Sequence, residues 1–349
     1  MQCPYCDFSI TTEPVKQNDQ KLAHAIAQDL EDSAALIDGR EFCSVYFGGG
    51  TPSLASAEAI AIILDAVKQN PFSEEMEITF EMNPRDVSAN KLSDLSALGI
   101  NRYSLGVQSY HDPELKGLGR NHDKASGLEA TKLLKGMNST IDLIYGTEYQ
   151  TATSFQETLE QFIDSQTNHL SLYQLTIEPN TIFYKKELKL PNEDQIEGME
   201  QLARQMLESN GYQQYEVSSW SRPGFESKHN LNYWQFGDFL GLGPGAHSKI
   251  TIGQEITRFR KIKPLNGYIA KQTIADHTII QGEELDMDLA MNLLRIKDGI
   301  LPDHLGVELP KSFLKKYQLG VEEGLLVQDK IGATARGYQY LNETIKLFF

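Results

Sequence analysis

Strand-like and helix-like segments alternate through the first two thirds of the chain, and no other feature constrains the fold as much. Five segments rich in β-branched and aromatic residues are each followed by a run of helical length. The strand-like segments are residues 42–47, 77–82, 102–108, 141–146 and 169–177, and the helix-like segments are residues 57–69, 88–98, 123–136, 153–165 and 193–209. This alternation predicts βαβ units and a parallel sheet, and the composition of its strands predicts apolar cover on both faces.

Polar residues lie at the carboxyl ends of these strands, which is where β/α barrels carry their chemistry. Five such units are typical of a partial or complete β/α barrel. We therefore predict an α/β fold with a partial, TIM-like barrel over residues 1–210, and we expect functional residues at the rim formed by the carboxyl ends of the strands.

The pattern changes after residue 210. Residues 211–284 indicate an extension of the barrel and a connecting segment, with one more strand near residue 215 and a loop rich in Gly and aromatic residues over 229–248. Residues 285–349 contain two helix-like runs, a hairpin-like stretch and a last helix-like run. This order predicts a small, winged-helix-like α+β unit.

Composition and charge exclude several classes of function. The chain has 349 residues and a net charge of −16, which disfavours a nucleic-acid partner. It contains no run of about 18 apolar residues, so we expect no membrane span. Met1-Gln2-Cys3 leaves no room for a signal peptide. The three cysteines, Cys3, Cys6 and Cys43, suit a reducing compartment. We therefore expect a soluble, cytoplasmic protein.

Cys3-Pro4-Tyr5-Cys6, near the start of the chain, allows three chemistries. A redox dithiol of the glutaredoxin kind needs a strand before the motif, and two residues cannot form one. A zinc site needs two more Cys or His ligands, and no second Cys-x-x-Cys exists. An iron–sulfur site is the third alternative. The motif alone does not decide among the three.

Two glycine-rich stretches could approach a ligand through the backbone. VYFGGGTPS (45–53) ends a predicted strand but lacks the Gly-Lys-Ser/Thr of a phosphate-binding P-loop. GLGPGA (241–246) resembles a dinucleotide fingerprint, but Pro244 would break the helix that must receive the pyrophosphate. We therefore exclude NAD.

Cys-x-x-Cys followed by Gly-Gly-Gly-Thr-Pro at the end of the next strand resembles the radical S-adenosylmethionine (SAM) superfamily. Further stretches make the chain similar to the oxygen-independent coproporphyrinogen III dehydrogenases, which are HemN-like, and to the related HemW family of heme chaperones. They are FEMNP (80–84), SLGVQS (104–109), LGRNH (118–122), IDLIYG (141–146), YQLTIEPNT (173–181), HNLNYW (229–234) and GLGPGAHS (241–248). The resemblance implies a partial β/α barrel of the radical SAM type.

The resemblance also implies a 4Fe-4S cluster held by Cys-x-x-x-Cys-x-x-Cys, with SAM bound at the open iron. Cys3 and Cys6 match the second and third ligands, and Tyr5 is expected near the cluster. The first ligand would lie four residues before Cys3, together with the family's first strand, so we expect a truncated or wrongly started sequence. Cys43 would lie roughly 15 Å from the rim, at about 3.3 Å per residue. We predict it to be a buried, apolar residue instead.

Seven positions match the family's contacts with SAM: Gly49, Gly50, Thr51, Glu81, Gln108, Arg120 and Asp142. The resemblance implies that the glycine motif holds the methionine end, that carboxylates accept from ribose hydroxyls or the ammonium, and that Arg120 pairs with the carboxylate. For any one of them alone, a polar rim residue or a helix cap is the simpler interpretation. Asp142 departs most from the family, because Gly146-Thr147-Glu148 follows it in place of Gly-Leu-Pro.

His229, Tyr233 and Trp234 form the motif that separates the two functions. In heme chaperones it is associated with heme binding, and a neutral imidazole is a good ligand for heme iron. A core histidine beside aromatic residues is the alternative. We expect His229 to bind heme, away from the cluster loop.

The dehydrogenases usually carry a fourth cysteine where this chain has Phe8, and a long N-terminal extension. We therefore predict a heme chaperone that binds cluster, SAM and heme and passes heme to an acceptor protein, which the sequence does not identify. A peripheral contact with a membrane-bound acceptor stays open. The alternatives are the enzyme, which converts two propionates of coproporphyrinogen III to vinyls, and an inactive fragment.

Overall fold

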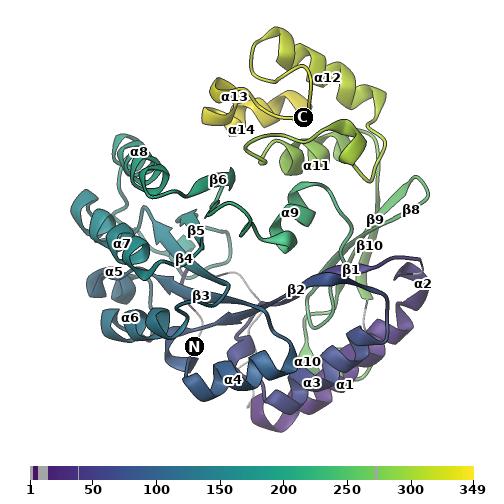
Figure 1. Ribbon diagram of the computed structural model, residues 1–349. Coiled ribbons are helices and arrows are strands. Elements are labelled where there is room, and N and C mark those ends of the chain that lie inside the picture. The colour runs from purple at the N-terminus through teal and green to yellow at the C-terminus, as the bar shows by residue number, and fades with distance from the viewer. Residues whose placement is uncertain (1–2, 7–14, 38, 272–273) are drawn as a thin grey trace.

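A seven-stranded sheet dominates the computed structural model, which describes residues 3–6, 15–37, 39–271 and 274–349. In spatial order the strands are β1 (Phe42–Phe47), β2 (Phe72–Met82), β3 (Arg102–Gln108), β4 (Ser139–Tyr145), β5 (His169–Gln174), β7 (Ser219–Ser221) and β6 (Gln213–Glu216). Strands β1 to β5 are parallel, and β7 is antiparallel to both of its neighbours. The sheet curls into half of a barrel, which confirms the predicted fold class (Figure 1).

Helices cover the outer side of this half-barrel (Figure 1). They are α3 (Ala57–Lys68), α4 (Ala89–Leu98), α5 (Asp112–Gly117), α6 (Lys124–Leu133), α7 (Ala152–Ser165) and α8 (Glu193–Ser209), and α1 (Val15–Asp32) with α2 (Ala34–Ile37) precedes them. Their ends follow local signals. Ser56 caps α3, and capping boxes at Thr151 and Asn192 begin α7 and α8. Helix α1, which the alternation does not predict, packs along α3.

The two faces of the sheet differ in polarity. In β3, Tyr103, Leu105 and Val107 point into the main apolar core, while the alternate residues Arg102 and Ser104 lie on the other face. Polar residues of neighbouring strands stand side by side on that inner face, since Glu81 pairs with Ser104 and Asp142 with Ser171. The expectation of apolar cover on both faces is therefore wrong for the inner face.

Residues 211–284 contain more regular structure than the sequence predicted. Helix α9 (Lys228–Trp234) replaces the expected loop around residue 229, because Ser227 caps its first turn. A three-stranded antiparallel sheet follows, made of β8 (His247–Ile252), β9 (Glu255–Lys261) and β10 (Ile274–Ile280), with α10 (Leu265–Ile269) between β9 and β10. A tight turn at Gly253, where φ is 62°, joins β8 to β9.

The last part of the chain has a second apolar core. Helices α11 (Glu283–Leu293), α12 (Lys311–Glu322), α13 (Ala335–Gln339) and α14 (Leu341–Ile345) surround buried residues such as Leu289, Phe313 and Phe348. Isolated bridges Leu326–Ala333 and Ile300–Ile331 stand where a hairpin was predicted. The predicted last helix is broken at Tyr340. Helices with short paired segments agree with the winged-helix-like α+β expectation.

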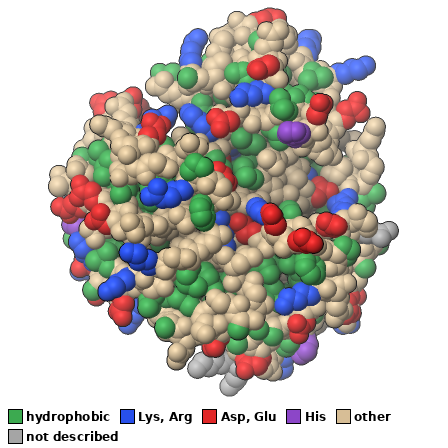
Figure 2. All heavy atoms as spheres, viewed as in Figure 1, with side chains coloured by type: hydrophobic (Ala, Val, Ile, Leu, Met, Phe, Trp, Pro, Cys, Tyr) green, Lys and Arg blue, Asp and Glu red, His purple; other side chains and the backbone are tan. Residues whose placement is uncertain are grey.

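The surface is mixed in charge. Lys and Arg side chains stand singly among acidic and apolar ones on the face drawn in Figure 2. No helix in the described ranges is both long and apolar enough to span a bilayer.

Candidate functional site

The Cys-Pro-Tyr-Cys turn is held in place by two other loops. The amide of Cys6 donates to the carbonyl of Cys3 at 3.1 Å, which closes the turn. The amide of Phe183 donates to the Pro4 carbonyl at 3.0 Å, and its ring lies 6.2 Å from that of Tyr5. On the other side Pro4 packs on Gly119, where an added Cβ would lie 2.5 Å from the proline ring. Both cysteines are therefore fixed to the barrel rather than carried on a free end.

Arg120 connects this turn to the rim of the sheet. Its Nη1 donates to Cys3 Sγ at 3.3 Å and to the Tyr5 hydroxyl at 3.5 Å. Its Nη2 donates to Asn83 Oδ1 and to the Gly106 carbonyl, both at 2.8 Å. The guanidinium thus brings three of the sequence-predicted residues, Arg120, Cys3 and Tyr5, into one cluster.

Glu81 anchors the glycine motif. Its Oε2 accepts from the Gly49 amide at 3.2 Å, and its Oε1 accepts from the Tyr46 hydroxyl at 2.8 Å. Burial, with a contribution from the nearby Asp142 charge, raises the pKa of Glu81 to about 7. Gly49 and Gly50 have φ angles of 72° and 50°, and no atom lies within 4 Å of a Cβ added at either. Glycine is needed there for the backbone turn, which leaves open space for a ligand.

Asp142 lies on the same inner face as Glu81. The Ser104 hydroxyl donates to its carboxylate at 2.6 Å, and burial raises its pKa to about 6. The structure therefore brings together the two carboxylates that the sequence proposed, although the residues after Asp142 depart from the family pattern. The charge of Asp142 contributes to the raised pKa of Glu81, because like charges repel.

Gln108 and Thr51 complete the predicted set. Gln108 has a φ of 69°, a left-handed conformation that residues other than Gly rarely adopt. Its amide nitrogen lies 3.0 Å from the position of a Cβ added to Gly106, close to Arg120. Strained backbone of this kind concentrates at ligand sites. Thr51 precedes the short turn Pro52–Leu54 without capping it through its side chain.

His229 is half-buried on α9, against β1. Its ring stacks on Tyr46, with centroids 4.4 Å apart and an interplanar angle of 20°, and meets Tyr233 edge-on at 5.0 Å. Burial lowers the pKa of His229 to about 4, so the imidazole is neutral at physiological pH. Its Nδ1 lies 3.5 Å from the Ser44 hydroxyl, which leaves Nε2 as the candidate ligand atom. Tyr46 contacts both His229 and Glu81. The histidine is therefore nearer to the residues predicted to bind SAM than we expected.

Trp234 does not share this surface. It packs against the second core, and the Arg295 guanidinium lies 5.2 Å from its ring centroid. The expectation that Tyr233 and Trp234 both flank the histidine holds for Tyr233 alone.

A buried carboxylate orients α9. Glu77 accepts from the Ser227 hydroxyl and from the amides of Lys228 and His229, at 3.1 to 3.2 Å. It also pairs with the buried Arg102 at 3.2 Å. The start of α9 is therefore tied to β2 and β3, which fixes where the imidazole lies.

The structure bears on the third cysteine, Cys43, and on the residues that could bind a metal. Cys43 is exposed on the edge strand β1, so the prediction that it is buried is wrong: an edge strand has one side without a covering element. In the described part of the chain no group of three or more Cys, His, Asp or Glu gathers as a complete metal site. Cys3 and Cys6 fit a cluster as two of its thiolates. Phe8 lies outside the described residues.

Sequence analysis missed Tyr46 and Asn83, which touch Glu81 and Arg120. A signal was present, because Tyr46, Thr79 and Glu81 alternate with apolar residues along β1 and β2. Strict alternation indicates a sheet with one polar face, and that face carries the site.

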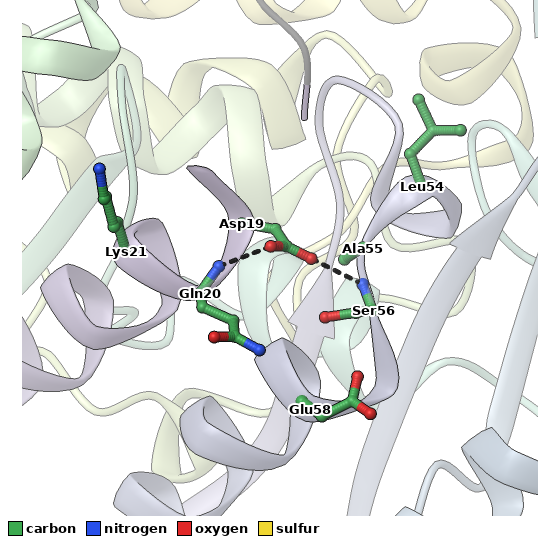
Figure 3. A pocket seen from close by; sticks show the side chains of 7 residues that line it. All are labelled: Asp19, Gln20, Lys21, Leu54, Ala55, Ser56 and Glu58. Atoms are coloured by element: carbon green, nitrogen blue, oxygen red, sulfur yellow. Dashed lines mark hydrogen bonds between the residues drawn. The ribbon is translucent and has the colours of Figure 1, made fainter. Parts of the chain in front are cut away.

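A hollow of about 570 Å³ lies between α1 and the turn after the glycine motif (Figure 3). Asp19 accepts there from the amides of Gln20 and Ser56. None of the predicted site residues lines this hollow, so it is separate from the inner-face site.

The chain is similar to several known proteins. Residues 1–162 match the family model of the radical SAM superfamily. The heme chaperone HemW of Haemophilus influenzae is 37% identical, over 99% of this chain and 94% of its own length. HemW of Escherichia coli is 34% identical over the same shares. The mitochondrial radical S-adenosyl methionine domain-containing protein 1 of Danio rerio is 35% identical, over 90% of this chain and 74% of its own length.

Among solved structures, the coproporphyrinogen III oxidase HemN of Escherichia coli, a radical SAM enzyme, superposes with a TM-score of 0.78. The match covers 100% of this chain and 87% of that one, at 23% identity. This likeness shows a shared fold.

Proposed function

Because the chain belongs to the HemW family within the radical SAM superfamily, we propose that it is a heme chaperone. In this proposal it binds a 4Fe-4S cluster, SAM and heme, and passes heme to an acceptor protein. The observation that carries the heme assignment is His229, a neutral imidazole stacked on Tyr46 at the inner face of the half-barrel.

The cluster and SAM belong at the rim in this proposal. Cys3 and Cys6 supply two thiolates, and Arg120 donates to Cys3 while it also binds Asn83 and Gly106. When bound, the cluster supplies the electron for reductive chemistry on SAM. Gly49, Gly50 and Thr51 border the open space for the methionine end. Glu81, Gln108 and Asp142 offer acceptors and donors for the ribose and ammonium.

The protonation of Glu81 and Asp142 matters for this role. Their pKa values, about 7 and about 6, mean that both carboxylates are largely ionised only above pH 7. SAM carries a sulfonium and an ammonium, and ionised carboxylates attract both. The buried positions strengthen that attraction, because little water screens it.

Heme is assigned to His229 through Nε2, with Tyr233 beside the ring. The low pKa keeps a lone pair free for iron at physiological pH. Glu77 fixes the helix that carries this ligand. Phe8, where the dehydrogenases have a fourth cysteine, supports the chaperone over the enzyme. The net charge of −16 supports a protein acceptor over a nucleic acid. The small number of cysteines, which suits a reducing compartment, supports the cytoplasm as the site of action.

Heme titration followed at the Soret band tests the proposal. We expect about one heme per chain, and His229→Ala should weaken binding at least tenfold or shift the band. His277→Ala is the matched control, because His277 is exposed on β10. A His229→Ala variant with unchanged affinity and spectrum would remove the histidine from the site.

An anaerobic activity assay separates the chaperone from the enzyme. A cluster-loaded form extended by a cysteine four residues before Cys3, supplied with SAM and a reductant, should not convert coproporphyrinogen III to protoporphyrinogen IX. Sustained formation of vinyl product would favour the dehydrogenase alternative. Transfer of heme from the loaded chain to an apo-hemoprotein, absent in His229→Ala, completes the test.

A further inference from the structure

Tyr46 touches residues that the proposed function assigns to two different ligands. Its hydroxyl donates to Glu81 Oε1 at 2.8 Å, on the side of the glycine motif. Its ring stacks on His229 with centroids 4.4 Å apart. Glu81 in turn accepts from the Gly49 amide at 3.2 Å. A continuous chain of contacts thus runs from the glycine motif to the imidazole through the side chains of Glu81 and Tyr46.

The ring of Tyr46 has little freedom to move on its own. A Cβ added at Gly48 would lie 2.6 Å from Tyr46 Cε1 and 3.1 Å from Glu81 Oε1, so backbone packs closely against both groups. The ring faces the histidine at an interplanar angle of 20°. Since Glu77 holds the backbone of His229, the imidazole cannot shift freely with the ring. A change in the position of Glu81 must therefore strain or break a contact of Tyr46.

We propose that Tyr46 is a positioning residue that couples the SAM-binding side of the inner face to the heme-binding histidine. This inference rests on the proposed function. The hydroxyl bond to Glu81 sets the plane of the Tyr46 ring, and the ring sets the orientation of the imidazole. Ligand contacts at Glu81 then change heme affinity, and heme at His229 changes the affinity for SAM by the same factor, as linkage requires.

A double-mutant cycle on heme affinity tests the coupling in the full chain without a need for cluster or SAM. The variants are Tyr46→Phe, Glu81→Met and the double variant. Tyr46→Phe keeps the ring and removes the bond, and Glu81→Met keeps the volume and removes the acceptor. Each single change should weaken heme binding by about three- to tenfold, and the double variant should bind as each single one does, because groups acting through one bond are non-additive.

Tyr145→Phe is the matched control. The Tyr145 hydroxyl also donates to a glutamate, Glu200, at 2.8 Å, but on the outer, helix-covered face. It should leave heme affinity and the Soret band unchanged. Thermal melting of every variant reports folding separately from binding.

The outcomes are distinguishable. A Tyr46→Phe variant that binds heme as the wild type does, or single effects that simply add, would overturn the coupling. If His229→Ala binds heme normally, the histidine is not the ligand, and the proposed heme site fails before the coupling is tested. If His229→Ala weakens heme binding and the double-mutant cycle is non-additive, both the proposed heme site and the coupling through Tyr46 are supported.

Discussion

Arg120 donates to the sulfur of Cys3 at 3.3 Å, although the two residues lie 117 positions apart. The same guanidinium reaches Tyr5, Asn83 and the carbonyl of Gly106. A planar fork with several donors can serve four partners at once, whereas a single ammonium cannot. This one side chain therefore joins the cysteine turn to the loop just after β2, through Asn83, and to β3, through Gly106.

Arg120→Lys should lose this connection while retaining the charge. In a cluster-loaded form extended by a cysteine four residues before Cys3, we expect SAM binding to weaken at least tenfold, with only a small loss of stability. Arg85→Lys is the control, because Arg85 is exposed nearby and donates to the Asn121 carbonyl at 2.9 Å. Isothermal titration of SAM gives the affinities. Equal affinity in both variants would contradict the role assigned to the fork.

Glu81 should make stability depend on pH. Its pKa is about 7 in the folded chain against 4.5 for a free side chain, so between these values the folded state holds a proton that the unfolded chain has released. Stability from this group therefore falls as pH rises from about 4.5 to 7. The side chain of the Glu81→Gln variant cannot titrate. The free energy of unfolding of this variant, relative to that of the wild type, should therefore increase by about 1–3 kcal/mol across that pH window.

Denaturant unfolding at pH 5 and pH 8 measures this difference. Glu75→Gln, an exposed change on the same strand, should show no such growth. Loss of the Gly49 contact adds an offset that does not vary with pH. A Glu81→Gln difference that is the same at both pH values would refute the raised pKa. In the wild type, SAM affinity should rise over the same window, because the ionised carboxylate attracts the cationic ligand.

Gln108 should hold its left-handed backbone at a cost in stability. Gln108→Gly and Gln108→Ala both remove the amide, but only Gly accepts a φ of 69° without strain. We expect the Gly variant to be more stable than the Ala variant by about 1 kcal/mol, and both to bind SAM more weakly. Gln166, with a φ of 60° at the end of α7, is the control. At that position the Gln166→Gly variant should also be more stable than the Gln166→Ala variant, but neither change should alter the affinity for SAM.

Cluster uptake should follow the number of thiolates on the turn. A SAM-binding 4Fe-4S cluster needs three, and Cys3 with Cys6 supplies two, so residues 1–349 should reconstitute to fewer than four irons per chain. A version extended by a cysteine four residues before Cys3 should take up four. Iron and sulfide analysis, with EPR in the presence of SAM, measures both forms. Cys43→Ser should not change the iron content of either form. Uptake of four irons by residues 1–349 would contradict the prediction.

Much of the site could be predicted from the sequence, but some of its neighbours could not. Glu81 and Gln108 stand at or next to the ends of β2 and β3, and a residue's place along a strand is a local property. Tyr46 and Asn83 were missed because their importance lies in what they touch. Cys43 was judged buried as a lone cysteine usually is, and the edge position of β1 made it exposed.

The sequence by itself determined the alternation of strands and helices between β1 and α8, the polar alternation of β2 and β3, and the glycines that shape the loop before Thr51. These follow from side-chain period, capping and φ, which act over a few residues. Only the tertiary structure decided that the polar faces of five strands line one concave surface. It also decided that α9 brings His229 onto Tyr46, and that the turn at Cys3 meets Arg120. These contacts join segments far apart in the chain, and they depend on the curl of the sheet and on the anchoring of α9 by Glu77.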